Sequence, residues 1–308
     1  KINRFGILKS AHQFHLHPVM NIHMNISMIT TTPEAKPKAV LFIIHGLNGK
    51  KERFLPFMEY MAGHGVACVT GDHRGHGGSV WAVEDLGYMY DGGYMALVDD
   101  LRMITERAHE LFPACPVFLL GHSMGSMAAR VYVKYDDSSI DGLILTGSPS
   151  WEPMSRIGMM LTWMLCHLGL SHLKMSYSQK RSSDKYNRRF ASEGPQSWTC
   201  SDAAVRKSFM DNPLCDFSLT ANGSYNLMAM MSETYGTDSW KVSNPSLPIL
   251  FLSGADDPLM RDEMHFHDSV RHICKRGYTN VTSVLYSDMR HEILNEIGKE
   301  SVWAEILE

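Results

Sequence analysis

The chain has 308 residues, with 44% hydrophobic and 20% charged side chains, as expected for a globular protein with a large core. Its formal net charge of −4 provides no basic field of the kind that holds nucleic acid. Six cysteines are scattered without a C-x-x-C pair and the first residues show no secretory pattern, so we expect reduced thiols and a cytoplasmic protein.

Residues 12–30 alternate polar and apolar side chains, which is typical of edge strands with one solvated face. The alternation places His15 and His17 on one outer strand face, so these histidines and nearby His12 are not expected to bind a metal. Farther along, short continuous apolar runs alternate with helical patterns and predict a doubly wound, mostly parallel sheet of the α/β class. We expect buried strands at 39–44, 66–70, 117–120, 143–146, 249–252 and 281–286, and helices at 52–63, 92–111, 124–135, 260–275 and 292–307.

The stretch from 150 to 245 interrupts this rhythm of strands and helices. It holds an apolar segment at 157–168, a serine-rich polar region at 176–202 and a second Met-rich segment at 227–231. We interpret it as a helical cap, or lid, inserted into the sheet fold after strand 6. The apolar segment either packs on the core or, because Met side chains adapt to varied shapes, lines an apolar substrate pocket. The predicted parts are a first core part at 1–149, the cap at 150–245 and a second core part at 246–308.

The most specific motif of the chain lies at residues 121–125. An apolar strand leads through Gly121-His122-Ser123-Met124-Gly125 into a helix-compatible segment, which is the strand–turn–helix setting of a G-x-S-x-G nucleophile elbow. Glycines on both sides let strand and helix approach closely and expose the serine hydroxyl beside the free N–H groups of a helix start. We therefore predict Ser123 as a nucleophile, the alternative being a glycine-rich turn with an incidental serine.

A serine hydroxyl is a weak nucleophile unless a base removes its proton and an acid orients that base. In this architecture the acid and then the histidine follow the serine along the chain. Asp256 and Asp257 both follow a predicted strand. We choose Asp257 because Pro258 fixes a turn directly after it, and keep Asp256 as the alternative. After the last predicted strand a single histidine remains, His291, which we predict as the base.

Acyl transfer also needs N–H donors for the oxyanion that develops on the substrate. We predict the backbone N–H groups of Met124, directly after the nucleophile, and of Leu47, in the glycine-containing loop after the first central strand. The polar segment 72–79 is interpreted as a scaffold that braces the Leu47 loop. Candidates for substrate contact are His45, Gly46, His122, Met159, Met160 and Trp163.

These motifs give the chain a resemblance to the α/β-hydrolase superfamily, and within it to the monoacylglycerol lipase and lysophospholipase branch of bacterial type. The matching segments are 44–46, 72–77, 121–125, 254–258 and 290–292. The resemblance implies the α/β-hydrolase fold, a triad of Ser123, Asp257 and His291, an oxyanion hole at Leu47 and Met124, and no cofactor. One departure is Gly49-Lys50, where family members often carry Glu-His, and it concerns the glycerol side of the pocket.

We expect a serine esterase that hydrolyses monoacylglycerols or related single-chain lipid esters, such as lysophospholipids, through an acyl-enzyme. One alternative is an aminopeptidase or amidase of the same fold, which would need carboxylates in the cap for a substrate amine; Asp184, Glu193 and Glu233 are available. Another is a non-catalytic lipid-binding protein, although such proteins commonly lack a triad member. Transient contact of the cap with a membrane surface is a further expectation, with few basic residues near its apolar segment.

Overall fold

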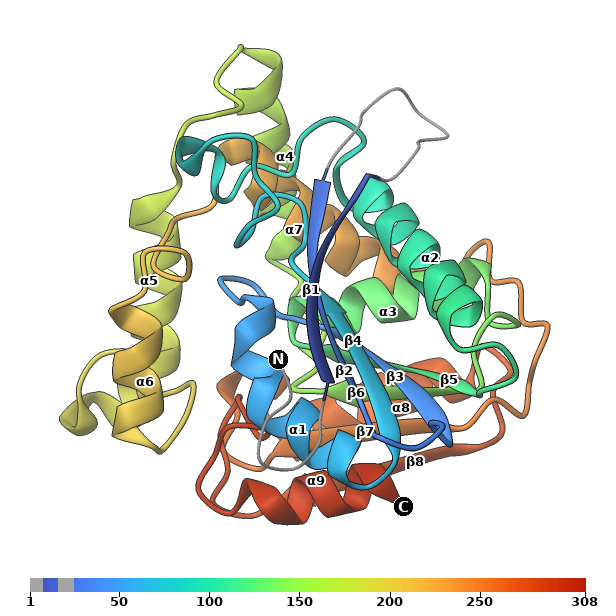
Figure 1. The fold of residues 1–308 in the computed structure, drawn as a ribbon. Coiled ribbons are helices and arrows are strands. Elements are labelled where there is room, and N and C mark those ends of the chain that lie inside the picture. Colours follow the sequence, from blue (N-terminus) through green and yellow to red (C-terminus); the bar gives the residue numbers. More distant parts are fainter. Residues whose placement is uncertain (1–7, 16–24) are drawn as a thin grey trace.

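A computed structural model of the chain describes residues 8–15 and 25–308, and its centre is an eight-stranded sheet. The strands are β1 (Leu8–His15), β2 (Asn25–Thr32), β3 (Ala39–Ile44), β4 (Val66–Gly71), β5 (Val117–His122), β6 (Gly142–Thr146), β7 (Ile249–Gly254) and β8 (Val281–Tyr286). They lie in the order β1-β2-β4-β3-β5-β6-β7-β8 (Figure 1). Strands β3 to β8 are parallel, whereas β2 is antiparallel to both of its neighbours. The predicted fold class is confirmed.

The predicted edge region at 12–30 contains the end of β1 and most of β2. Its residues 16–24, including His17, lie outside the described residues. The paired strands β1 and β2 form one margin of the sheet, as the alternating pattern indicates.

Helices cover both faces of the sheet, because side chains of the central strands alternate between two hydrophobic cores. In β3, Val40 and Phe42 point into one core and Leu41 and Ile43 into the other. The first core is closed by α2 (Gly93–Leu111), α3 (Met124–Tyr135) and α8 (Glu263–Cys274), and the second by α1 (Leu55–Gly63) and α9 (Lys299–Leu307).

Three predicted helices begin later than expected. The helix expected at 52–63 opens with a 3-10 segment at Lys51–Phe54 and becomes α1 only at Leu55. The helix expected from residue 260 starts at Glu263, because Arg261 has a positive φ of 71° and the Asp262 carboxylate caps the first turn. The helix expected at 292–307 starts only at Lys299; residues 292–298 form turns instead. A bond from the Glu292 N–H to the Thr199 carbonyl fixes the start of these turns.

The chain leaves the sheet after β6, forms helices, and returns to the neighbouring β7. These helices are α4 (Ser155–His167), α5 (Ser176–Asn187), a 3-10 segment (Arg188–Glu193), α6 (Ala203–Met210) and α7 (Ala221–Tyr235). In Figure 1, α4, α5 and α6 stand to one side of the sheet. Helix α7 instead reaches the core, where Met230 is fully buried with residues of α2 and α3. None of the described helices is both long and apolar enough to cross a lipid bilayer.

The register of the parallel strands brings their carboxyl ends to one edge of the sheet. Ile44 pairs with Gly71 and Gly121, and Thr146 pairs with His122 and Leu252. Ligands of such sheets bind beyond this edge. The loops that carry the predicted chemical residues therefore start from adjacent positions.

Candidate active site

Ser123 lies between β5 and α3 in a strained backbone conformation, with φ 55° and ψ −119°. Such a conformation costs roughly 1–3 kcal/mol and persists only where its surroundings enforce it. Its N–H donates to the carbonyl of Thr146 at 2.9 Å, which ties the turn to β6. A side chain at Gly125 would collide with the carbonyl of Ile44, so α3 can approach β3 only because that position is glycine.

His291 and Asp257 form a buried hydrogen-bonded pair at the same edge. The Nδ1–H of His291 donates to Asp257 Oδ2 at 2.8 Å, and the two residues are 4% and 2% exposed. Burial lowers the pKa of His291, but the Asp257 carboxylate outweighs it and raises this pKa above its ordinary value. Asp256, the alternative acid, pairs instead with Arg189 at 2.6 Å.

The imidazole of His291 lies beside the nucleophile turn. Its ring packs against Gly147, which follows the Thr146 that holds Ser123, and its centroid is 4.8 Å from the ring of His122. Among the described residues, no direct hydrogen bond joins the Ser123 hydroxyl to this imidazole. Bonds between nucleophile and base often form only when substrate binds, so the pair is adjacent but not yet engaged.

The loop after β3 contacts the nucleophile turn directly. A Cβ added at Gly46 would lie 2.9 Å from the Cβ of Ser123, so this approach requires glycine. The N–H groups of Leu47 and Met124 donate to no protein atom in the described part of the chain. Two free donors near one hydroxyl are what an oxyanion hole needs.

Segment 72–79 braces this loop, as its composition predicts. The N–H of His73 donates to His45 Nε2 at 2.9 Å, and His73 Nε2 donates to the His45 carbonyl at 2.8 Å. His45 Nδ1 donates to the Gly46 carbonyl, so both ring nitrogens of His45 are occupied. Burial lowers the pKa of His45 and that of His73 well below the ordinary value. It also lowers the pKa of neighbouring His76, to about 4, so the cluster stays uncharged. No set of His, Cys, Asp and Glu side chains among the described residues could hold a metal ion.

The loop of His291 is also fastened to the insertion between β6 and β7, a feature that sequence reasoning missed. Arg290 makes two bonds to the Glu193 carboxylate, at 2.6 and 3.0 Å, and a third to the Ser197 carbonyl at 2.6 Å. The ring of Trp198 packs against the His291 ring with centroids 5.3 Å apart. Arg290 belongs to the matching segment 290–292, but the sequence alone suggested no role for it. Nothing in the sequence pattern pointed to Trp198.

A second ion pair, largely shielded from solvent, lies beside the first. Glu292, the residue after the base His291, binds Arg53 at 2.9 Å. It also lies 3.6 Å from Nε2 of His122, the residue before the nucleophile, and so links the two loops. Burial opposes its ionisation, yet Arg53 and His122 hold the pKa of Glu292 well below its usual range. His122 is buried, and its Nδ1 is bonded to Thr146 Oγ1 at 3.1 Å.

Of the predicted substrate contacts in the insertion, Met159 is half-buried in α4, whereas Met160 and Trp163 are 55% and 46% exposed. The contact of these three side chains with substrate stays a prediction, and the two exposed ones could meet a ligand only at the surface.

A comparison with known families matches residues 35–298 to the family described as serine aminopeptidase, S33. Among curated proteins, human monoglyceride lipase is 28% identical over 37% of this chain and 36% of its own length. A probable lysophospholipase L2 of Haemophilus influenzae is 29% identical over 37% of this chain and 36% of its own. Each of these alignments thus spans about a third of the curated relative.

Solved structures resemble the chain over nearly its whole length. A thermostable carboxyl esterase from Bacillus coagulans, in complex with glycerol, superposes with a TM-score of 0.85 at 24% identity and covers 98% of this chain and 96% of its own. A soluble variant of monoglyceride lipase from Saccharomyces cerevisiae gives 0.73 at 15% identity, over 96% and 94%. At these identities the likeness establishes the fold alone.

Proposed function

Because the chain belongs to the serine aminopeptidase S33 family of α/β-hydrolases, we propose that it is a serine hydrolase that cleaves esters of single-chain lipids. Monoacylglycerols and lysophospholipids are the substrates we favour, and the proposal needs no cofactor. The observation that carries it is the buried Asp257–His291 pair, at 2.8 Å, beside the strained turn of Ser123. An acid that orients a base next to a serine hydroxyl is the arrangement that acyl transfer requires.

In the proposed mechanism, Ser123 Oγ attacks the ester carbonyl while His291 Nε2 takes the hydroxyl proton. Asp257 holds the Nδ1–H of the imidazole and stabilises the imidazolium that forms. The N–H groups of Leu47 and Met124 bind the oxyanion of the tetrahedral intermediate. The imidazolium then gives its proton to the alcohol as the ester C–O bond breaks. Water attacks the acyl-enzyme with His291 again as base, and the fatty acid leaves.

The lipid part of the proposal is supported by the apolar side chains of the insertion and by the names of the relatives. We propose that residues 150–245 act as a cap over the core parts 1–149 and 246–308 and that the cap receives the acyl chain. Each buried methylene contributes about 0.8 kcal/mol, so the rate should rise with acyl length. A steep preference for acetyl esters would refute the lipid substrate and leave the esterase intact.

A fluorophosphonate probe tests the chemistry directly. The intact protein should be labelled and the Ser123→Ala variant should not, because the probe phosphonylates an activated serine. Ser126, the next serine on α3, gives a matched control: its hydroxyl is buried and bonded to the Ser123 carbonyl at 2.6 Å, so Ser126→Ala should still be labelled. Absence of labelling in the intact protein would favour the non-catalytic lipid-binding alternative.

An aminopeptidase would bind the substrate amine with a free carboxylate in the cap. The three predicted candidates all have cationic partners: Asp184 pairs with Lys180, Glu193 with Arg290, and Glu233 with Lys134. This occupancy favours the ester over the amide. Turnover of an acyl ester should therefore exceed that of the matching aminoacyl amide, and the reverse order would make the aminopeptidase the better description.

We also propose a cytoplasmic location. All six cysteines, which lie within the described residues, are unpaired, as a reducing compartment would keep them. The proposed partner is the small lipid ester itself, without nucleic acid.

A further inference from the structure

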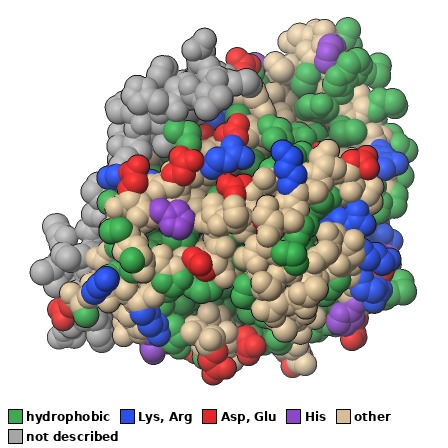
Figure 2. Space-filling view, turned by 90° about the vertical axis from the view of Figure 1, so that its right-hand side faces the viewer, with side chains coloured by type: hydrophobic (Ala, Val, Ile, Leu, Met, Phe, Trp, Pro, Cys, Tyr) green, Lys and Arg blue, Asp and Glu red, His purple; other side chains and the backbone are tan. Residues whose placement is uncertain are grey.

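Exposed apolar side chains are concentrated in one part of the insertion. Ten of the fifteen large hydrophobic side chains that are exposed among the described residues lie within residues 154–177. We call these ten side chains the apolar rim; Leu168, at 72% exposed, and Tyr177, at 79%, are its most exposed members. Figure 2 shows hydrophobic side chains gathered at the upper right, at the height that α4 has in Figure 1. Contiguous apolar patches on a soluble surface generally mark a site of interaction.

The opposite side of α4 already has a partner, so the rim faces outward. Thr162 is buried, and a Cβ at Gly158 would collide with Met228 of α7. The helix therefore packs on α7 through its small residues and leaves most of its large ones exposed.

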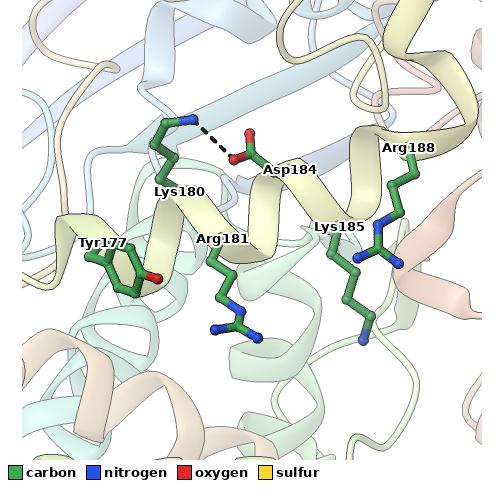
Figure 3. A pocket seen from close by; sticks show the side chains of 6 residues that line it. All are labelled: Tyr177, Lys180, Arg181, Asp184, Lys185 and Arg188. Atoms are coloured by element: carbon green, nitrogen blue, oxygen red, sulfur yellow. Dashed lines mark hydrogen bonds and ion pairs between the residues drawn. The ribbon is translucent and has the colours of Figure 1, made fainter.

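The rim continues into a row of cations on α5 and at the residue that follows it. Arg181, Lys185 and Arg188 extend from the same side of α5 as Tyr177 and line one shallow pocket with it (Figure 3). We call these three cations the basic face. Lys180, next to them, is paired with Asp184 at 3.0 Å. In a chain with a net charge of −4, the basic face is a local positive surface at the margin of an apolar one.

The other side of α5 contacts the candidate active site. Gln179 Nε2 donates to Asn48 Oδ1 at 3.3 Å, and Asn48 follows the proposed oxyanion donor Leu47. Farther along the helix, the Tyr186 ring packs against the Trp198 ring with centroids 5.4 Å apart, and Trp198 in turn packs on His291. A single helix thus separates the basic face from the site.

We propose that the apolar rim and the basic face together dock on an anionic phospholipid surface. The rim inserts its side chains among the acyl chains, and the basic face binds the headgroup phosphates. Charge complementarity selects this occupant, because the three cations of the basic face meet no unpaired acid within their pocket. Docking would hold α5, and the site beneath it, against the surface in which a lipid ester resides. The benefit of docking for the enzyme rests on the proposed function, but binding to the surface does not itself require catalysis.

Vesicle co-sedimentation of the Ser123→Ala chain tests docking without hydrolysis. Vesicles of phosphatidylcholine alone are compared with equal parts of phosphatidylcholine and phosphatidylglycerol. We expect stronger binding to the anionic vesicles, weakened by salt. The variant Arg181→Gln/Lys185→Gln/Arg188→Gln should bind them roughly 100-fold less. A control with the same charge change, Lys36→Gln/Arg271→Gln/Lys275→Gln, uses exposed cations outside the insertion and should bind as before.

A second pair of variants tests the apolar rim. Leu168→Ser should weaken binding to both kinds of vesicle, whereas Leu111→Ser, at a 41% exposed position of α2, should not. Thermal unfolding checks that every variant folds. Equal binding to neutral and anionic vesicles, or equal losses in the two triple variants, would overturn the role of the basic face. A concentration-dependent dimer that Leu168→Ser abolishes, without vesicle binding, would show that a second copy covers the rim and would overturn the proposal. If vesicles bind as expected but no ester is cleaved, only the proposed function fails.

Discussion

Asp257→Asn is the sharpest test of the proposed mechanism, because the structure dictates how the new amide must lie. The Leu259 N–H donates to Asp257 Oδ1 at 2.8 Å and would keep the amide oxygen at that position. The amide NH2 then faces His291 Nδ1, which must become an acceptor, and the ring proton moves to Nε2. An Nε2 that carries a proton cannot accept another from Ser123. The expected loss in kcat is about 10⁴-fold, or about 5 kcal/mol of activation free energy.

The pH profile provides a second readout of this variant. In the native chain the base must be neutral, so activity falls as the pH drops through the pKa of His291, which Asp257 raises. Without the carboxylate, burial dominates, and the acid limb of residual activity moves to lower pH. Stability should change as well: the raised pKa stabilises the folded state at pH values below the unfolded pKa, and this contribution disappears in the variant.

The assay is hydrolysis of a soluble chromogenic ester across pH, with Asp256→Asn as the matched control. Asp256 pairs with Arg189, a residue whose side chain is 67% exposed, so its kcat/KM should stay within about threefold of the native value. Retention of more than about a tenth of native kcat by Asp257→Asn, or an unmoved acid limb, would refute the assignment.

Three further outcomes are expected. Gly46→Ala places a methyl group against the nucleophile and should lower kcat at least about tenfold in the same assay. The control Gly63→Ala has open space around its new methyl group and should leave the rate unchanged. It should also raise the free energy of unfolding in urea by about 0.5–1 kcal/mol. Arg290→Lys keeps the charge, but a lysine cannot bind the Glu193 carboxylate and the Ser197 carbonyl at the same time. We therefore expect kcat to fall roughly 3- to 10-fold at nearly constant KM. An unchanged kcat would mean that this contact does not position the base. Because burial lowers the pKa of His76 to about 4, stability should be lost as the pH falls from about 6.5 toward that value, and His76→Asn should flatten this loss in urea unfolding; an identical pH dependence would contradict it.

The central strands could be predicted because they are buried on both faces and therefore appear as continuous apolar runs. The strand at 281–286 was expected to be buried as well, but β8 is the last strand of the sheet and none of its residues is fully buried. Strands β3 and β8 have the predicted bounds, and β5 and β7 extend two residues beyond them. Helix starts were less predictable, since Asp262 and Arg261 decide one of them through a cap and a positive φ. The bond that holds Glu292 to Thr199 joins residues far apart in the chain, and no local pattern reports such a contact.

The candidate site likewise contains residues that the sequence predicts and residues that only the tertiary structure identifies. Ser123, Asp257 and His291 follow strand ends in a fixed order, so position along the chain was enough to select them. The choice between Asp256 and Asp257 needed geometry, because both residues fit the turn before Pro258. Trp198 and the Glu193–Arg290 pair come from the insertion, whose contacts with the sheet edge depend on tertiary packing.

The bonds between Arg290 and Glu193 divide the insertion into a part that is attached to the loop of His291 and a part that can move without it. A hinged opening that carried Glu193–Ser201 along would pull the base away from its acid, so any such motion must be confined to the helices before Arg188. Chimeric proteins should follow the same boundary. Exchanging residues 154–187 with a relative should yield an active enzyme with altered chain-length selectivity, whereas exchanging the whole insertion should disable the base unless the loop around His291 is transplanted with it.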